Sequence, residues 1–221
     1  MVVNAAFFHQ DIEEAYIFAG GRYARIKWTP YTSKEERTWG PSLISDDWPG
    51  ITEAGFNTID AVLPIQGVTT EFYFFSNGRV ARVQVIPGEE DEIVEDPLSI
   101  TDKWKSLNRA GFHTIDAAML VPGGENEAYL FSGEKYVRID VVNDKVTYGP
   151  ANLNDKWPGL AQQGLTSVDA AIPVPNAKVD GETYFFIGTQ YVRNQVVRGA
   201  SDKVTWGAHP IADYWKTLDW I

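Results

Sequence analysis

The chain alternates apolar and polar positions in four segments, each divided by a short turn. The flanking residues are β-branched or aromatic, which is typical of half-buried strands. The central residues of each segment favour the positive φ of a two-residue hairpin turn. The pattern therefore predicts four strand–turn–strand units. They cover residues 13–28, 70–85, 126–141 and 181–196, with turns at Gly20-Gly21, Asn77-Gly78, Gly133-Glu134 and Gly188-Thr189.

Each segment is followed by a third extended element and then by a short amphipathic stretch that carries a Trp. The third element contains WGP at 39–41, YGP at 148–150 and WGA at 206–208, whereas the second repeat has Asp96 in place of the glycine. Polar residues near the start of the Trp stretch are predicted to cap a helix of one or two turns. These residues are Ser45, Thr101, Asn154 and Asp213.

The whole unit recurs about every 55 residues, which is close to the length of a propeller blade. Each unit supplies four short strands and one helical turn, and units packed radially cover one another. The sequence predicts an all-β fold, a four-bladed β-propeller with a central channel. The predicted blades of this single domain are residues 1–52, 53–108, 109–162 and 163–221. The Trp that recurs once per unit is interpreted as a core wedge between blades. These tryptophans are Trp48, Trp104, Trp157 and Trp215.

The first strand of each unit begins VNAA, IDAV, IDAA or VDAA, and a propeller places this strand next to its axis. Only small side chains let four backbones come close, which explains the alanines at 5, 61, 117 and 170. The inner edge lacks a partner strand, so its carbonyl groups need water or a hard cation such as calcium, which takes about six to eight oxygen ligands. A ring of N–H groups at another depth could hold an anion. The polar residue before the alanine makes the channel mouth electronegative or hydrogen-bonds to nearby backbone. This residue is Asn4, Asp60, Asp116 or Asp169.

The formal net charge of −11 excludes nucleic acid as a favoured partner, because phosphates would be repelled. Cations and polyamines would be attracted, although an acidic surface also serves solubility alone. The sequence contains no cysteine, which rules out disulfides and thiolate metal sites. No apolar run is long enough to span a membrane, and no signal peptide is recognisable. We therefore expect a soluble protein of the cytoplasm or of a storage compartment.

The sequence carries no recognisable catalytic site. The three histidines, His9, His113 and His209, have no partners at metal-ligand spacing, and no G-x-S-x-G motif is present. Paired acids such as Asp46-Asp47 are interpreted as solvated turns and caps. His113 precedes the inner strand of the third unit, so it is expected near the channel mouth, where an imidazole could ligate haem iron. A surface or hydrogen-bonded imidazole is the simpler interpretation.

Aromatic residues also recur on the outer strand, where they could stack on sugar rings. Trp39, Tyr148 and Trp206 occupy this position in three of the units. Repeated shallow sites would raise avidity through multivalency. The alternative is simple packing at the sheet edge. Trp28 and Trp220 fall outside the repeat, and Trp220 is expected to close the ring or to form a homodimer contact.

The D-A-A/V strand, the E-x-Y-x-F hairpin with Y-V/A-R, and the D-x-W-P-G-L segment resemble hemopexin repeats over essentially the whole chain. The chain is similar to the albumin-2 family of legume seeds and to the hemopexin-fold lectins of mushrooms. The resemblance implies a channel cation, calcium or sodium, with chloride at a second depth. It also implies polyamine or haem as ligands. The implied metal site consists of the carbonyls of Asn4, Asp60, Asp116 and Asp169, with a second ring at Ala6, Val62, Ala118 and Ala171.

These observations leave two classes of function. The first is a non-enzymatic protein that holds a metal ion in its channel and binds a small ligand. The second is a carbohydrate-binding lectin with sites on the blades, and a storage protein is a further alternative. Many hemopexin domains join their first and last blades by a disulfide. Because this chain has no cysteine, closure must depend on packing of residues 2–8 against residues 212–221.

Overall fold

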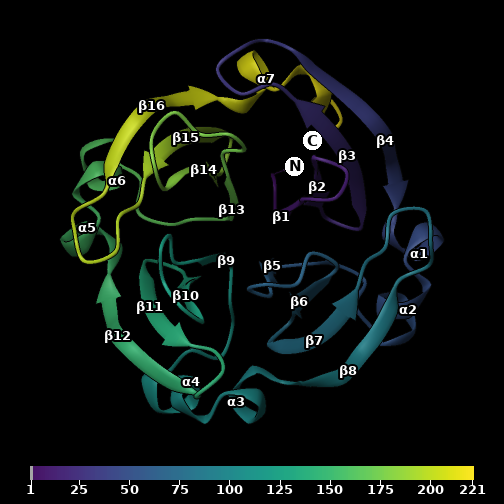
Figure 1. The fold of residues 1–221 in the computed structure, drawn as a ribbon, viewed down its shortest axis with the longest axis horizontal. Coiled ribbons are helices and arrows are strands. Elements are labelled where there is room, and N and C mark those ends of the chain that lie inside the picture. Colours follow the sequence, from purple (N-terminus) through teal and green to yellow (C-terminus); the bar gives the residue numbers. More distant parts are fainter. Residues whose placement is uncertain (1) are drawn as a thin grey trace.

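The computed structural model describes residues 2–221 as four sheets arranged around one axis (Figure 1). Each sheet has four antiparallel strands in chain order. Blade 1 contains β1 (Ala5–His9), β2 (Glu14–Ala19), β3 (Arg22–Trp28) and β4 (Glu35–Leu43). Blade 2 contains β5 (Ala61–Pro64), β6 (Glu71–Ser76), β7 (Arg79–Gln84) and β8 (Glu92–Ser99). Blade 3 contains β9 (Ala117–Leu120), β10 (Glu127–Ser132), β11 (Lys135–Asp140) and β12 (Lys145–Asn152). Blade 4 contains β13 (Ala170–Pro173), β14 (Glu182–Ile187), β15 (Gln190–Gln195) and β16 (Lys203–Pro210).

Two short helical segments follow each blade, separated by the recurring Trp. They are α1 (Ile44–Asp47) and α2 (Pro49–Glu53), α3 (Ile100–Lys103) and α4 (Lys105–Ala110), α5 (Leu153–Lys156) and α6 (Pro158–Gln162), and α7 (Ile211–Tyr214) and the 3₁₀ helix η1 (Lys216–Leu218). Among residues 2–221, the helices are all too short or too polar to cross a membrane. The predicted four-bladed propeller is confirmed, with a pair of helices per blade instead of one.

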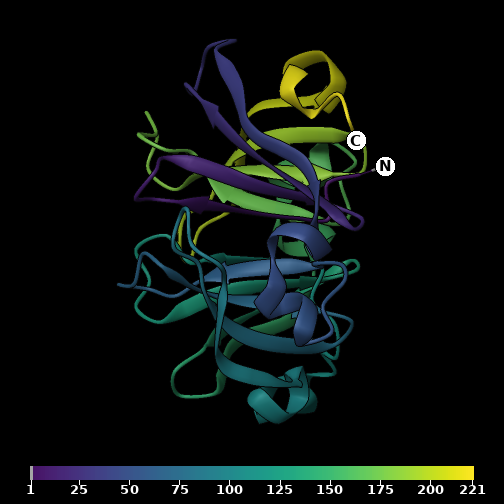
Figure 2. The ribbon, with the colours of Figure 1, turned by 90° about the vertical axis from the view of Figure 1, so that its right-hand side faces the viewer.

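The strands β1, β5, β9 and β13 surround the axis and contact one another around the ring. Their first residues are the predicted alanines at 5, 61, 117 and 170, which are almost completely buried. The turns between the second and third strands also lie where the pattern predicts them, and Gly20 and Gly133 have φ values of 56° and 55°. Figure 2 turns the ring on its side, and both views place the two chain ends next to each other.

The E-x-Y-x-F and Y-V/A-R motifs meet across the hairpin of each blade. The Tyr on the second strand faces the Arg on the third strand in the register, as Tyr16 faces Arg25. The Arg also pairs with the Glu that begins the second strand. The N···O distances are 3.7 Å for Arg25 and Glu14, 2.5 Å for Arg82 and Glu71, 3.2 Å for Arg138 and Glu127, and 3.9 Å for Arg193 and Glu182. The repeated motif is therefore a repeated ion pair within the blade.

The recurring tryptophans pack between blades, as predicted. All four are at most 4% exposed, and each belongs to a different core cluster. Trp48 contacts Phe74 of blade 2 at a ring distance of 5.7 Å, and Trp215 contacts Trp28 of blade 1 at the same distance. Each wedge thus joins its own blade to the next one around the ring.

The predicted helix caps are wrong. The helices begin at Ile44, Ile100, Leu153 and Ile211, so Ser45, Thr101, Asn154 and Asp213 lie inside the first turn. Each strand runs directly into its helix, and the buried apolar residue at the first helical position anchors the junction in the core. Ser99 is the one residue at these four N-caps, all within the described chain, whose side chain accepts a backbone hydrogen bond, from the Asp102 N–H at 2.9 Å.

The second helical segment of each blade is capped by a carboxylate from the next blade. Asp91 accepts hydrogen bonds from the N–H groups of Gly50 and Ile51, at 3.0 and 2.7 Å. A Cβ on Gly50 would lie 2.7 Å from Asp91 Oδ2, so the glycine of the W-P-G motif makes room for this cap. The equivalent caps are Asp144 on α4, Asp202 on α6 and Glu35 on Thr217 of η1.

Noncovalent contacts close the ring between blade 4 and blade 1. Val3 and Ala6 share a core cluster with Trp215 and Leu218, and Trp28 and Trp220 pack against it. This confirms the expected packing of the two chain ends and places Trp220 in the closure. Arg37 adds hydrogen bonds to the Asp219 carboxylate at 2.8 Å and to the Thr217 carbonyl at 3.2 Å.

Candidate functional sites at the channel mouth and between blades

The channel mouth is the ring of polar residues that precede the inner strands, namely Asn4, Asp60, Asp116 and Asp169. The backbone N–H of each residue donates to the carbonyl of a phenylalanine on the second strand, at 2.8 to 2.9 Å. The side-chain oxygen accepts a hydrogen bond from the backbone N–H of the hairpin turn, at 2.6 Å in each blade. This confirms the expected local hydrogen bonding of these side chains.

The second predicted ring lies within the inner strands, and its members are nearly buried: Ala6, Val62, Ala118 and Ala171. At the far ends of β5, β9 and β13, the N–H groups of Ile65, Val121 and Val174 donate to the neighbouring strand. Successive residues of an antiparallel strand direct their peptide groups alternately to opposite sides. Counted from these far ends, Val62, Ala118 and Ala171 turn their N–H and C=O groups away from the neighbouring strand, towards the axis. The alternation is interrupted at the start of the strand, because the Asp60 N–H and the next residue, Ala61, both lie opposite Phe75.

The three carboxylates at the mouth interact electrostatically. Burial raises the pKa of Asp60 and of Asp169, the hydrogen bonds from the turns lower it, and the negative charge of Asp116 raises it further. Among residues 2–221, no three His, Cys, Asp or Glu side chains are placed to hold a metal ion. A cation at this mouth would therefore depend on backbone carbonyls, with the carboxylates supplying negative potential. An all-oxygen donor set of this kind fits a hard cation.

The histidines lie in three different surroundings. His113 is exposed, and its carbonyl lies beside the turn that carries Gly78, so it is near the channel mouth as expected. His9 is fully buried between blades 1 and 2, where its Nε2 is 3.0 Å from the Val85 carbonyl. His209 packs on Trp206 at a ring distance of 4.7 Å.

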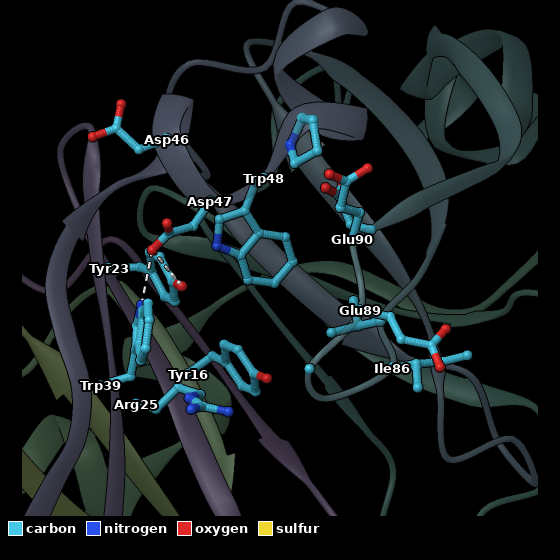
Figure 3. Close-up of a pocket in the computed structure, with 14 residues that line it drawn as sticks. Tyr16, Tyr23, Arg25, Trp39, Asp46, Asp47, Trp48, Ile86, Glu89 and Glu90 are labelled. Atoms are coloured by element: carbon cyan, nitrogen blue, oxygen red, sulfur yellow. Dashed lines mark hydrogen bonds between the residues drawn. The ribbon is translucent and has the colours of Figure 1, made fainter.

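A pocket of about 440 Å³ lies between blade 1 and the β7–β8 loop of blade 2 (Figure 3). We call it the acidic pocket. Its aromatic wall comes from β2, β3, β4 and the residue after α1, and its rim carries carboxylates. Asp47 accepts hydrogen bonds from the Tyr23 hydroxyl at 3.0 Å and from Trp39 Nε1 at 2.8 Å. The aromatic wall consists of Tyr16, Tyr23, Trp39 and Trp48, and the rim acids are Asp46, Asp47, Glu89 and Glu90.

The equivalent boundary between blade 4 and blade 1 holds a pocket of about 490 Å³, the closure pocket. The β3–β4 loop of blade 1 covers it, and the Arg193 guanidinium lies 4.5 Å from the Tyr31 ring and 5.4 Å from the Trp206 ring. Burial raises the pKa of Tyr184 to about 12. The wall residues are Tyr184, Tyr191, Arg193, Trp206 and Trp215, and the rim includes Tyr31, Lys34, Tyr214 and Lys216.

The two pockets use the same positions of the repeat, with Tyr16, Tyr23, Arg25, Trp39 and Trp48 in one and Tyr184, Tyr191, Arg193, Trp206 and Trp215 in the other. Between blades 3 and 4 the equivalent space shrinks to about 40 Å³. Of the predicted sugar-stacking residues, Trp39 and Trp206 line pockets and are 46% and 39% exposed. Tyr148 is also 39% exposed, stacks on Tyr136 at 5.9 Å and is not among the residues that line the two pockets.

The interpretation of Asp46-Asp47 as a solvated turn is wrong for Asp47. This residue ends α1 at the pocket wall, where its carboxylate holds Tyr23 and Trp39. The interblade caps were also missed by the sequence analysis. A signal for two of them exists, because Asp144 and Asp202 stand in the repeated D-K-V that begins the outer strand.

Comparisons with known proteins agree with this architecture. A family model described as Hemopexin matches residues 3–53 and 115–162. Albumin-2 of Pisum sativum is 28% identical over 98% of this chain and 94% of its own length. The crystal structure of a hemopexin fold protein, CP4, from cow pea is 31% identical, with a TM-score of 0.89 over 100% of this chain and 98% of that chain. A plant lectin with two metal binding sites from Cicer arietinum is 28% identical, with the same TM-score and coverage. The chain therefore belongs to the hemopexin family of four-bladed propellers.

Proposed function

We propose that the protein is a non-enzymatic binding protein that holds a hard cation in its central channel and takes a small ligand at the negatively charged mouth. The observation that carries the proposal is the ring of Asn4, Asp60, Asp116 and Asp169 at the start of the inner strands. Each side chain commits one oxygen to a hairpin turn. The carbonyls of these residues and the axis-facing carbonyls of the second ring are the proposed ligands of the cation.

The charge of the mouth favours a cationic ligand. The raised pKa of Asp60 and of Asp169 reflects burial first and the negative charge of Asp116 in addition. A polyamine would neutralise that charge, whereas the propionates of haem would add to it. His113 is exposed, and the other two histidines lie elsewhere in the fold. We therefore place polyamine before haem as the organic ligand of the mouth.

Thermal unfolding of chelator-treated protein tests the channel cation. A ligand that binds only the folded state stabilises it by about 2.7 kcal/mol at a concentration of a hundred times its Kd. We expect calcium to raise the melting temperature and spermine to raise it further. Parallel scans with sodium and with haemin compare the other expected ligands. An unchanged melting temperature with every cation would refute the proposal.

The variant Asp116→Asn separates the two modes of cation binding. If backbone carbonyls are the ligands, this variant keeps the cation, with an affinity within about threefold of the original, because only the long-range charge is lost. Loss of the cation in this variant would mean that the carboxylates bind directly. Glu125→Gln, an exposed acid on the β9–β10 loop, is the control for the change in net charge.

A second function, carbohydrate binding, is favoured by the closure pocket. Trp206 and Tyr214 are 39% and 44% exposed at its edge, and Tyr184, Tyr191 and Trp215 line its wall. Exposed aromatic rings beside polar groups suit the apolar face of a pyranose ring. The similar Cicer arietinum protein is described as a lectin.

Agglutination of red cells, with calorimetric titration of simple sugars, tests this second function. We expect Trp206→Ala to weaken sugar binding about tenfold, which corresponds to about 1.4 kcal/mol. Tyr148→Ala is the matched control, because Tyr148 packs on Tyr136 outside the pockets. Equal agglutination by the Trp206 variant and the original protein would remove the closure pocket as the sugar site.

A further inference from the structure

The acidic pocket combines an aromatic wall with carboxylates that have no cationic partner in the chain. Trp48 stands edge-on to the rings of Tyr16 and Tyr23, at 5.6 and 5.4 Å. Within residues 2–221, Asp46, Asp47, Glu89 and Glu90 form no salt bridge. Figure 3 places Asp47 on one side of Trp48 and Glu89 and Glu90 on the other. The pocket is therefore lined by aromatic rings and by negative charge together.

The one cationic side chain of the lining is already engaged. Arg25 pairs with Glu14 at 3.7 Å, and its guanidinium lies 5.9 Å from the Tyr16 ring and 5.6 Å from the Trp39 ring. Asp91 also lines the pocket, but its carboxylate caps α2. Asp47 uses only Oδ2 for the bonds from Tyr23 and Trp39, and within residues 2–221 its Oδ1 accepts no hydrogen bond. Burial raises the pKa of Tyr23, and the bond to Asp47 and its charge raise it further.

In blade 2, the position equivalent to Asp47 is occupied by a cationic side chain of the protein itself. Lys103 ends α3 as Asp47 ends α1, and its Nζ lies 5.2 Å from the Tyr73 ring and 6.0 Å from the Trp104 ring. The same ammonium forms an ion pair with Glu95. Tyr73, Trp104 and Glu95 hold the repeat positions of Tyr16, Trp48 and Trp39.

The same helix position explains why the acidic pocket is open. It is Lys103 in blade 2, Lys156 in blade 3 and Tyr214 in blade 4, and the space beside Lys156 is only about 40 Å³. In blade 1 the position is Asp47, so a carboxylate replaces the chain's own ammonium group. The space that the lysine side chain fills in blade 2 is then left for a group from outside.

From this comparison we propose that the acidic pocket binds a protonated primary amine, whose ammonium group lies against Tyr16 and Trp48 and pairs with Asp47 and the acids of the β7–β8 loop. Cation–π attraction and ion pairing act together at such a position. The amine can belong to an amino sugar or to a lysine side chain, and the ammonium group is the chemistry that the two share. This site is separate from the channel and does not depend on the proposed channel cation.

Calorimetric titration at low salt tests the proposal with two matched pairs of probes. The first pair is glucosamine and N-acetylglucosamine, and the second is Nα-acetyl-lysine amide and its Nε-acetylated form. We expect each amine to bind at least tenfold more tightly than its acetylated partner, because acetylation removes the charge. The tighter of the two amines identifies the source. Equal binding of the acetylated and free forms would overturn the proposal.

The variant Asp47→Lys rebuilds blade 1 on the pattern of blade 2. It should fold, since lysine occupies the equivalent position in two other blades, and we expect it to lose amine binding by at least tenfold. Asp47→Asn is the second variant, and it should weaken the amine without filling the pocket. Glu125→Gln, an exposed acid on the β9–β10 loop, should bind the amine as the original protein does. Amine binding that persists in folded Asp47→Lys, or that is lost in Glu125→Gln, would overturn the proposal.

Discussion

The acidic pocket and the closure pocket are built on the same aromatic wall but differ at the rim. The wall comes from repeated positions of β2, β3, β4 and the wedge Trp, so the two pockets share Tyr, Tyr, Arg, Trp and Trp. Part of the rim comes from the next blade's loop, which brings Glu89 and Glu90 to one pocket and Tyr31 and Lys34 to the other. The rest comes from the blade's own helices, with Asp47 at one pocket and Tyr214 at the other. The comparison teaches that the repeat supplies a common scaffold and that the rim residues of the loop and helix supply selectivity.

The largest expected difference between the two boundaries concerns stability. Trp48→Ala and Trp215→Ala each remove a buried wedge, which costs about 3–5 kcal/mol of the free energy of unfolding. We expect the higher cost for Trp215→Ala, because the chain itself joins blades 1 and 2, whereas blades 4 and 1 meet only through noncovalent contacts. Urea denaturation measures both variants. A smaller loss for Trp215→Ala than for Trp48→Ala would show that closure does not depend on this wedge.

The interblade caps should also differ in their contribution to stability, but by less than the tryptophan wedges do. Asp91 accepts two backbone hydrogen bonds near the acidic pocket, whereas Glu35 accepts one beside the closure pocket. We expect Asp91→Ala to lower the free energy of unfolding by about 2 kcal/mol and Glu35→Ala by about 0.5–1 kcal/mol. Chemical denaturation of both variants, with Glu125→Ala as an exposed control, measures the difference. Equal losses of stability in the two variants would show that the number of backbone hydrogen bonds does not determine the strength of a cap.

The rim acids should affect amine binding more weakly than Asp47 does. The double variant Glu89→Gln/Glu90→Gln removes two exposed charges, and we expect a loss of about 1 kcal/mol in amine affinity at low salt. Exposed charges are screened at a Debye length of about 3 Å in 1 M salt, so the difference should disappear there. Calorimetry at the two ionic strengths checks this. Sugar binding at the closure pocket should be unaffected by the double variant.

The smallest expected effect is in tyrosine ionisation at high pH. Burial raises the pKa of Tyr184 to about 12, and burial followed by the bond to Asp47 raises the pKa of Tyr23. Because the pKa of the tyrosine is higher in the folded state, the protonated hydroxyl contributes to folding stability. This contribution is complete below pH 10 and is lost as the pH rises through the folded-state pKa. We expect Asp47→Asn to lower the pKa of Tyr23 and to leave that of Tyr184 unchanged. Ultraviolet titration of phenolate measures both, and a shift at Tyr184 alone would contradict the assignment.

The features that repeat with the same spacing could be predicted from the sequence. The hairpin turns, the inner strands with Ala61 and Ala117, and the wedge tryptophans follow from local patterns that recur in each blade. The interblade pockets could not be predicted in this way, because each one needs a loop from the next blade. Asp47 illustrates the limit, since its role depends on Tyr23 and Trp39 from other strands.

The channel mouth shows the same division between local and distant information. The D-A-A pattern predicts that Asp116 hydrogen-bonds to nearby backbone, and Asp116 does accept a bond from the Gly133 N–H. Burial is the main reason for the raised pKa of Asp60 and of Asp169. The pattern does not predict that the charge of Asp116 adds to this effect, because Asp116 lies in another blade. The pattern likewise does not predict that Tyr148 stacks on Tyr136, and sugar stacking at Tyr148 stays a prediction.

The carboxylate caps should allow the ring to assemble whichever blade comes first in the chain. Every blade boundary uses the same device, with Asp91, Asp144, Asp202 or Glu35 reaching back to the preceding blade. The boundary between blade 4 and blade 1 is held by this device, by packing and by the hydrogen bonds of Arg37 to Asp219 and Thr217. Circular permutants that join Met1 to Ile221 through a short linker and open the chain before blade 2, 3 or 4 should therefore assemble the same ring. The position at which the chain starts is then one of four that are compatible with the same ring of blades.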